Sequence, residues 1–487
     1  MKEKEFSVLT RRNFLRRAAC AALGTGALSA AIGDLRFINS AAAQSAVSDY
    51  KALVCIFLSG GNDSNNLIIP RIQSEYDDYA ALRGDALALP ISGAPNVAIP
   101  LPSLNSDGHE YGLHPACPEL ATLFNENKLA VLFNTGTLLY PMTRAQYQSG
   151  LLQKPPQLFS HSDQVTQWQT SIPDRPPLNG WGGRCADLLA AVQPGAPISM
   201  AITVAGANTF EVGNVMSQYS VTTSGAINLS SVTGARLQSL TNLLALPYPN
   251  LQVQAYSKIG EHAIQTGGLL NAAIASTSNA NYWTVPFRTT ITSPTGGNPF
   301  GTGLASQLRM IARLIEAGNR SAANGGFGMK RQIFFCQVGG YDTHSGQTQG
   351  PGLTTVGSHA NLLAELSQGM NSFQRAMEQL GLSNNVTSFT ASDFGRTFPS
   401  NDGGTDHGWG SHHLIMGGAV NGRRTYGRFP TLAVNGPDDT STGRWIPSTA
   451  VDQYFATLAT WFGVDNGNLP IVFPNLGRFA TPNLGFV

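Results

Sequence analysis

Charged residues are scarce in this 487-residue chain. Asp, Glu, Lys and Arg make up 12% of it, against roughly 25% in an ordinary globular protein. The two signs also nearly balance, with 30 basic and 29 acidic residues. A chain without an excess of either sign has no electrostatic reason to bind nucleic acid or an anionic membrane surface, so we expect no nucleic-acid partner. The low charge favours polar but uncharged loops, which 53 glycines and 28 prolines also indicate.

Cysteines and long apolar runs are few as well. The chain has five cysteines, and their spacing matches no zinc module. Cys55 and Cys336 lie in apolar runs that indicate buried strands, so free buried thiols are favoured over disulfides. Beyond the N-terminal region, no segment has the roughly 20 apolar residues that span a bilayer. We therefore expect no stable membrane anchor.

The N-terminus has the pattern of an export signal. Residues 10–16 read Thr-Arg-Arg-Asn-Phe-Leu-Arg, which pairs two arginines with a following Phe-Leu as the twin-arginine (Tat) translocase requires. Small residues at Ala41 and Ala43 fit the cleavage rule for signal peptidase. Residues 1–43 are therefore predicted to be a Tat signal peptide, with the Tat translocase as a partner during export. The mature chain, 44–487, is predicted to be periplasmic or secreted.

Three apolar runs each lead into a short loop that holds an aspartate. Residues 52–58 precede Asp63, residues 332–338 precede Asp342, and residues 386–390 precede Asp393. A fully apolar run that ends in such a loop is typical of a central parallel strand in an α/β sheet. Ligands bind beyond the carboxyl ends of such strands, so the sequence predicts that these aspartates meet at one edge of the sheet.

Histidines gather around the same loops. His344 follows the second aspartate, and His407, His412 and His413 follow the third, while His161 lies at the start of a predicted helix. Aspartate and histidine are the ligands of Zn²⁺ and related divalent metals. An aspartate after a strand can instead form an Asx-turn or cap a helix. For the whole set we favour a metal or anion site.

The pattern between these strands predicts an α/β domain. Helices are expected over 117–127, 304–317, 357–380 and 449–463, and further strands over 129–133 and 414–417. A helix is expected to start near Ser160, because Ser and Asp are good N-caps. The looser region 197–299, with helical patterns at 234–245 and 251–276, is predicted to be an insertion or cap on the main sheet.

Five phrases resemble those of the bacterial family named domain of unknown function 1501: SGGNDSNNLIIP, FSHSDQVTQWQT, GGYDTHSGQ, SDFGRT and DHGWGSHH. That family is regarded as a distant relative of the alkaline phosphatase and sulfatase superfamily. The resemblance implies an alkaline-phosphatase-like, three-layer α/β/α sandwich with a mostly parallel central sheet and an inserted cap region. It also implies a two-metal site at the strand ends.

The resemblance further implies roles for single residues. The nucleophile would be Ser160, or as second choice Ser162, and Arg396 or Arg144 would bind a substrate oxygen. The implied metal ligands are Asp63 and Asp393 for one metal and Asp342, His344 and His407 for the other, with His412 and His413 as alternatives to His407. Phe394 stands where the family pattern has a second histidine, and the Asp-x-His spacing is shorter than usual. Both departures favour a single good metal site.

These observations lead to two hypotheses. The first is an exported, metal-dependent hydrolase of small anionic phosphate or sulfate esters. Its cofactor would be a divalent metal, Zn²⁺ first, with Ca²⁺, Mg²⁺ or Mn²⁺ as alternatives. The second is a non-catalytic exported protein that keeps the fold but serves in binding or assembly.

Overall fold

The computed structural model describes residues 47–487 except 178, 228, 230 and 279–281. The predicted signal peptide, 1–43, lies outside the described residues. A mixed, mostly parallel sheet runs through the molecule in the strand order β14-β5-β13-β12-β1-β11-β6-β7-β8. At its centre β1 (Lys51–Leu58) pairs in parallel with both β11 (Arg331–Val338) and β12 (Val386–Ser392).

One strand beyond β12 in the main sheet runs in the opposite direction. β13 (Ser411–Met416) is antiparallel to both of its neighbours, β12 and β5 (Leu129–Gly136). It therefore begins at the sheet edge where the parallel strands end. The shorter strands are β6 (Ala201–Thr203), β7 (Tyr219–Thr222), β8 (Gly225–Ala226), β14 (Thr425–Tyr426) and β15 (Thr449–Ala450).

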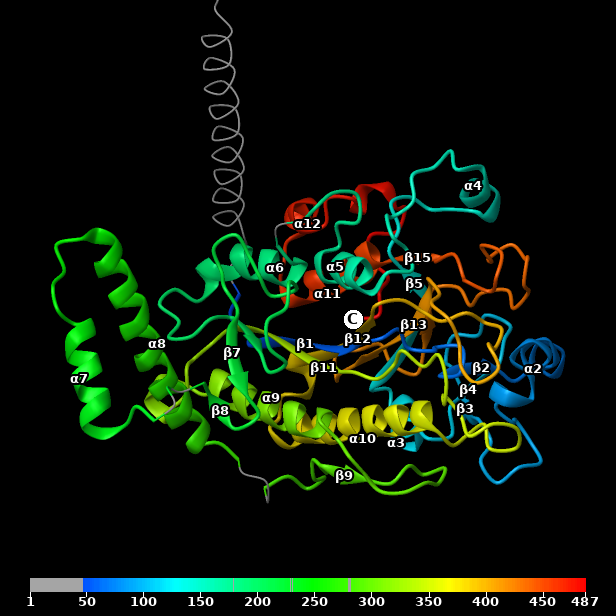
Figure 1. Ribbon diagram of the computed structural model, residues 1–487, viewed down its shortest axis with the longest axis horizontal. Coiled ribbons are helices and arrows are strands. Elements are labelled where there is room, and N and C mark those ends of the chain that lie inside the picture. The colour runs from blue at the N-terminus through cyan, green and yellow to red at the C-terminus, as the bar shows by residue number, and fades with distance from the viewer. Residues whose placement is uncertain (1–46, 178, 228, 230, 279–281) are drawn as a thin grey trace, which may run out of the picture.

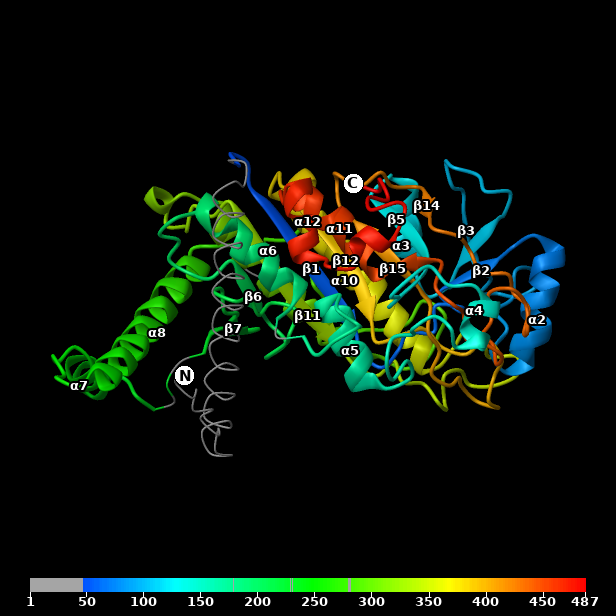
Figure 2. The ribbon, with the colours of Figure 1, turned by 90° about the horizontal axis from the view of Figure 1, so that it is seen from above.

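Helices cover both faces of the sheet (Figure 1 and Figure 2). One face carries α3 (Pro118–Asn125), α9 (Leu304–Asn319) and α10 (Ser358–Gln379). The other carries α5 (His161–Thr170), α6 (Trp181–Leu189), α11 (Val451–Phe462) and α12 (Leu469–Val472). This arrangement confirms the predicted three-layer α/β/α sandwich with a mostly parallel sheet.

The unbroken apolar sequence of β1 follows from this layering. Val54 and Ile56 belong to the core on one face, whereas Cys55 and Phe57 belong to the core on the other. Successive strand residues point to opposite faces, so a strand covered on both sides needs apolar residues throughout. The four described cysteines are free and buried, which confirms the prediction made for them. Among the described residues, no helix is both long and apolar enough to cross a bilayer.

A small lobe beside the main sheet is absent from the expectations above. It holds a three-stranded sheet, β2 (Ile68–Pro70), β4 (Tyr111–Leu113) and β3 (Ile99–Leu101), and the helix α2 (Gln73–Leu87). The buried residues of α2 are Tyr79, Arg83 and Leu87, so its inner face includes a charged side chain. This face does not stand out as an apolar stripe, which is why periodicity alone misses the helix.

The predicted insertion, 197–299, has two parts. Its first strands belong to the main sheet, since β6 pairs in parallel with β11. Its helices α7 (Gly234–Leu244) and α8 (Leu251–Ala275) form a hairpin, called the arm below. In both views the arm lies beyond β7 and β8 at one end of the molecule, so it does not cover α5.

The remaining elements of the chain include α4 (Arg144–Ser149), β9 (Thr290–Ile291) and β10 (Phe300–Gly301).

The buried carboxyl group of Glu211, in the loop between β6 and β7, predicts a pH-dependent stability. Burial raises its pKa from 4.5 to about 8, although Asn208 donates a hydrogen bond to it. The folded protein thus keeps a proton on Glu211 that the unfolded chain has lost, and the contribution of Glu211 to the free energy of unfolding should fall as pH rises through this window. Each unit of difference in pKa corresponds to about 1.4 kcal/mol.

Denaturant unfolding at several pH values between 5 and 8 would measure this slope. Glu211→Gln should remove the part of this slope that Glu211 causes, because an amide does not titrate. Glu110→Gln, at an exposed position, is the matched control and should leave the slope unchanged. Equal slopes in wild type and Glu211→Gln would contradict the prediction.

Candidate metal centre

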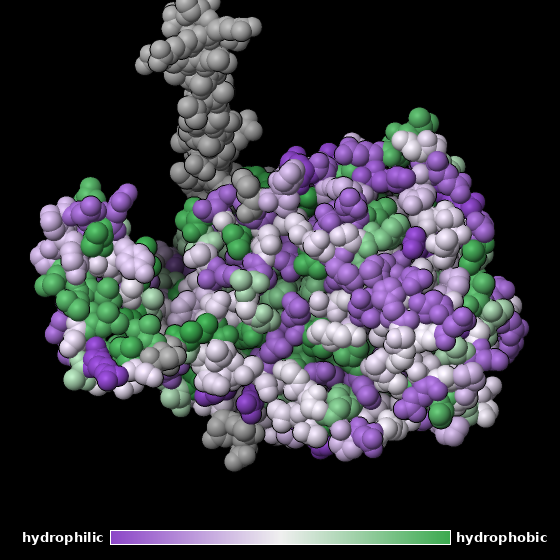
Figure 3. Space-filling model, viewed as in Figure 1, coloured by the Kyte–Doolittle hydropathy of each residue, from purple (hydrophilic) through white to green (hydrophobic). Residues whose placement is uncertain are grey.

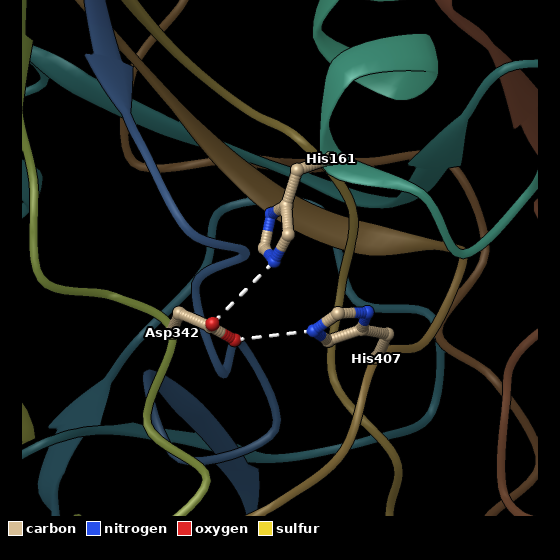
Figure 4. Close-up of side chains that lie close together, drawn as sticks. All are labelled: His161, Asp342 and His407. Carbon is tan, nitrogen blue, oxygen red and sulfur yellow. Dashed lines mark hydrogen bonds and ion pairs between the residues drawn. The ribbon is translucent and has the colours of Figure 1, made fainter.

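Three side chains from distant parts of the chain converge at the carboxyl ends of the central strands (Figure 4). They are His161, Asp342 and His407, and one ligand atom from each lies within 4.8 Å of the others. Asp342 follows β11, His161 is the first residue of α5, and His407 lies in the loop before β13. This is the edge where the strand pattern predicted a ligand site.

The carboxylate of Asp342 is the centre of the cluster. Its Oδ2 lies 3.4 Å from Nε2 of His161, and its Oδ1 lies 3.2 Å from Nε2 of His407. His344 reaches the same carboxylate, with its Nε2 3.1 Å from Oδ1. The same nitrogen is 3.0 Å from Nε2 of His407. Three imidazoles thus turn the same ring nitrogen toward one carboxylate.

The opposite nitrogen of each ring faces a group that accepts hydrogen bonds. Nδ1 of His161 is 2.7 Å from a carboxylate oxygen of Asp393. Nδ1 of His407 is 2.8 Å from the carbonyl oxygen of Phe159, and Nδ1 of His344 is 3.0 Å from Asp406. A hydrogen bond to such an acceptor requires a proton on Nδ1. A neutral ring then presents a lone pair at Nε2.

Lone pairs of two imidazoles and one carboxylate then meet at the centre of the cluster. The Nε2 atoms of His344 and His407 face each other and also face Oδ1 of Asp342, so neutral rings would place acceptor against acceptor. Only a shared proton or a cation makes this arrangement favourable. Carboxylates and carbonyls that hold Nδ1 are also the usual outer partners of metal-binding histidines.

The charges around Asp342 keep it ionised. Its side chain is 43% exposed, and Arg396 donates a hydrogen bond of 2.6 Å to Oδ1. Burial raises the pKa of Asp342, but Arg396, His344 and His161 outweigh it and hold the pKa below its ordinary value. Burial lowers the pKa of His407, and nearby cations add to this effect. A neutral imidazole beside an ionised carboxylate suits metal binding.

Asp393 contacts the cluster through the far nitrogen of His161. It is buried, with Oδ1 accepting from the backbone N–H of Gly60 at 3.1 Å and Oδ2 bonded to His161. Burial raises the pKa of Asp393 despite both hydrogen bonds. The neighbouring Phe394 packs its ring 4.9 Å from that of His161 and 4.6 Å from that of His407. Phe394 therefore supports two of the imidazoles.

Asp63 lies in a separate, fully buried setting. Arg83 forms an ion pair with its Oδ2, and Gln347 donates to the same oxygen. Burial raises the pKa of Asp63, but Arg83 and His359 reverse the shift and lower it. No group of three or more metal-binding side chains within the described residues includes this aspartate. Its role as a ligand stays a prediction, and its observed partner is an arginine.

His412 and His413 are also buried away from the cluster. Nδ1 of His412 accepts from the backbone N–H of Asn134 at 3.1 Å, and its ring packs against Phe133. His413 packs against Trp168 on the other face of β13. Burial lowers the pKa of each ring to about 3. The structure thus brings neither histidine into contact with Asp342 among the recorded interactions.

Ser160, the nucleophile that the resemblance implies, is the neighbour of His161 in sequence. Ser160 stands between Phe159, which bonds to His407, and His161. Its hydroxyl donates to Asp163 at 2.6 Å and lies 3.3 Å from that of Ser162. It makes no hydrogen bond to the N–H groups of α5. The hydroxyl is therefore not used as a helix cap.

The two arginines predicted to bind substrate make different hydrogen bonds. The guanidinium of Arg396 is buried and also donates to Gly60 and Thr405, so it positions Asp342. Arg144 donates to Asp439 and Asn435. A third arginine, Arg444, was not predicted from the sequence; its Nε donates to the carbonyl oxygen of His407 at 2.8 Å.

That arginine stacks on an aromatic ring beside the site. The guanidinium carbon of Arg444 lies 4.2 Å from the ring centre of Phe159, and its Nη atoms have no recorded hydrogen bond to any described residue. Asp406, the partner of His344, was likewise not predicted from the sequence. His161 was predicted near the site but not among the ligands. The adjacency of Ser160 and His161 at a helix start was the available signal.

These features define an α/β/α protein with an Asp/His cluster at the ends of its parallel strands. The model of a family described as protein of unknown function (DUF1501) matches residues 313–466. This range contains Asp342, His344, Asp393 and His407, and the match confirms the resemblance for this part of the chain. No curated protein matched the chain.

Three solved structures have limited similarity to the chain. Ps i-CgsB in complex with k-i-k-neocarrahexaose has a TM-score of 0.33 and 10% identity, over 89% of this chain and 78% of that one. The PsFucS1 sulfatase from Pseudoalteromonas sp. has a TM-score of 0.32 and 9% identity, over 93% and 74%. A mutant of the alkaline phosphatase PafA has a TM-score of 0.25 and 10% identity, over 72% and 64%. Similarity at this level says nothing about activity.

Proposed function

We propose that this chain is an exported, metal-dependent hydrolase of small phosphate or sulfate esters, with one cation held by His161, Asp342, His407 and His344. The observation that carries the proposal is the convergence of the Nε2 atoms of three imidazoles on one carboxylate. Export by the twin-arginine route rests on residues 10–16 and suits a protein that acquires its metal while folding in the cytoplasm.

The donor set fits Zn²⁺ best. Zn²⁺ is usually bound by imidazole nitrogens with a carboxylate or water completing four ligands, whereas Ca²⁺ and Mg²⁺ prefer sites made of oxygens. A cluster dominated by nitrogen therefore favours Zn²⁺ over Ca²⁺ and Mg²⁺, with Mn²⁺ intermediate. One cation, rather than the two that the family resemblance implies, agrees with the pairing of Asp63 with Arg83.

The remaining side chains supply positioning and charge. When bound, the divalent cation would lower the pKa of a coordinated hydroxyl or water and neutralise charge on the reacting ester. Ser160 is the proposed nucleophile, and Asp163 orients its hydroxyl. The Nη atoms of Arg444 have no recorded partner among the described residues, so they are the proposed contact for non-bridging ester oxygens. Arg396 keeps Asp342 in place.

Two observations favour a second candidate, a non-catalytic exported binding or assembly protein. Phe394 stands where the family pattern has a histidine, and Asp63 pairs with an arginine. A protein that has lost its second metal site could retain the fold and one cation without turnover. Metal content and activity together distinguish the two candidates.

Elemental analysis of protein exported by its own host tests the proposal. We expect about one Zn²⁺ per chain and hydrolysis of an aryl phosphate or aryl sulfate that a chelator abolishes. Ser160→Ala should abolish turnover and leave the metal bound, since His161, His344, Asp342 and His407 are proposed to hold it without the hydroxyl. Bound metal without turnover in wild type would favour the binding protein. Absence of metal after incubation with each divalent ion, together with no turnover, would exclude the hydrolase.

A further inference from the structure

The arm, 234–275, exposes more apolar surface than a free helical hairpin normally does. α7 contains no buried residue. Six large apolar side chains, at the tip of the arm and along the adjoining part of α8, are exposed by between 44% and 78%: Leu243, Leu246, Leu251, Val253, Tyr256 and Ile259. Figure 3 shows hydrophobic side chains gathered on the arm. A helical hairpin that leaves one side in water gains little from packing, so a further layer would stabilise it.

A groove at the base of the arm continues this surface. Its volume is about 660 Å³, and it lies between α8 and two loops of the body. Ile259, Ala263 and Thr266 line one wall, while Ile198 and Met216 belong to the other. The arm and the groove therefore form one apolar surface at the end of the molecule farthest from the small lobe (Figure 1).

The charge of the arm excludes several kinds of partner. Between residues 234 and 275 the only charged side chains are Arg236, Lys258 and Glu261. A surface with so little charge has no means of attracting nucleic acid or an anionic membrane. It also offers no complement to a strongly charged protein. The partner must itself present an uncharged, apolar face.

The sequence of α8 favours a second copy of this chain as that partner. Ala255, Ile259 and Ala263 are exposed and spaced by four residues, so they lie on one stripe of the helix. The order small, large, small reads the same in both directions. Two copies of α8 packed antiparallel across a two-fold axis at Ile259 would place Ala255 of each copy opposite Ala263 of the other. This is the self-complementarity that a two-fold dimer requires.

The available area also fits a dimer. The six apolar side chains, with Val215 at 83% exposed, leave on the order of 700 Å² in water, taking roughly 150 Å² for each fully exposed side chain, the lower end of the range for aromatic ones. That exceeds the largest apolar patch of a typical monomer and approaches the roughly 800 Å² that each partner buries in a standard interface. We propose that the chain forms a two-fold dimer through the arm, with α8 packed against α8 at Ile259 and the tip of each arm over the groove of the other copy.

Light scattering on the purified, exported protein tests this proposal. At micromolar concentration the mass should be that of two chains. Ile259→Asp should weaken dimerisation at least 100-fold, because each dimer then holds two buried charges at the axis. Since Ile259 is exposed in the monomer, the circular dichroism spectrum and melting curve of the diluted variant should stay those of a folded monomer. Leu353→Asp, also exposed but outside the arm, is the matched control.

Oxidative cross-linking tests the position of the axis. The described cysteines are all buried, so a cysteine introduced on the surface is a specific probe. Ile259→Cys should form a disulfide-linked dimer, because the two copies of this residue meet at the axis, and Leu353→Cys should not. A monomeric wild type, a dimer unaffected by Ile259→Asp, or binding to neutral phosphatidylcholine vesicles in place of dimerisation would each overturn the proposal.

Discussion

Asp342→Asn is expected to release the cation and to lower hydrolysis by at least about 100-fold. The asparagine keeps the size of the side chain but removes the charge toward which His161, His344 and His407 point. It also removes the carboxylate that balances the buried guanidinium of Arg396. Metal content per chain, measured after dialysis against a weak chelator, should fall from about one to nearly zero.

Asp402→Asn is the matched control for this substitution. Asp402 lies in an exposed position of the loop before His407, and its positive φ of 74° is one that asparagine tolerates well. The same chemical change there should leave metal content and activity as in wild type. Full metal content in Asp342→Asn would show that this carboxylate is not a ligand and would remove the basis of the proposed centre.

Gly60→Ala is expected to destabilise the fold by more than about 3 kcal/mol or to prevent folding, because two penalties coincide. Gly60 has a φ of +117°, which side-chain-bearing residues rarely adopt. A Cβ atom there would overlap the backbone nitrogen of Asp342 and lie 2.9 Å from the carbonyl carbon of Tyr341. Its N–H also bonds to Asp393, so a shift of this loop moves two aspartates of the site.

Gly339→Ala provides the comparison at the same edge of the sheet. Gly339 has no positive φ, and a Cβ atom there would meet nothing within 4 Å. This variant should unfold within about 1 kcal/mol of wild type and keep its metal. Denaturant unfolding and metal analysis of both variants would check the prediction. Stability of Gly60→Ala equal to that of Gly339→Ala would contradict it.

The main-sheet elements were predictable because their signals are local. The helix expected over 357–380 is observed at Ser358–Gln379, and the strand expected over 386–390 at Val386–Ser392. Both have patterns that depend only on which side of the element is buried. The small lobe was not predictable in this way, because α2 packs a charged Arg83 inward against Asp63 from a different loop.

The composition of the site was partly predictable for the same reason. Strand ends and loop residues placed Asp342, His344, Asp393 and His407 at one edge of the sheet. His161 lies among the ligand atoms because it packs near Asp342 and His407, and both are more than 180 positions away along the chain. No local pattern encodes a contact of that separation. Asp393, predicted as a ligand, contacts Nδ1 of this ring, and its role as a ligand stays a prediction.

The sequence by itself determined the buried strands, the helices between them and the acidic residues at the strand ends, because each follows from the alternation of apolar and polar residues along one element. Only the tertiary structure decided which side chains contact each aspartate. Asp63 and Asp342 follow similar strands, yet Arg83 lies against the first and three imidazoles against the second. The strands carry no record of these partners, because the partners come from other parts of the chain. The site depends on packing between loops, which the order of residues in any one loop does not reveal.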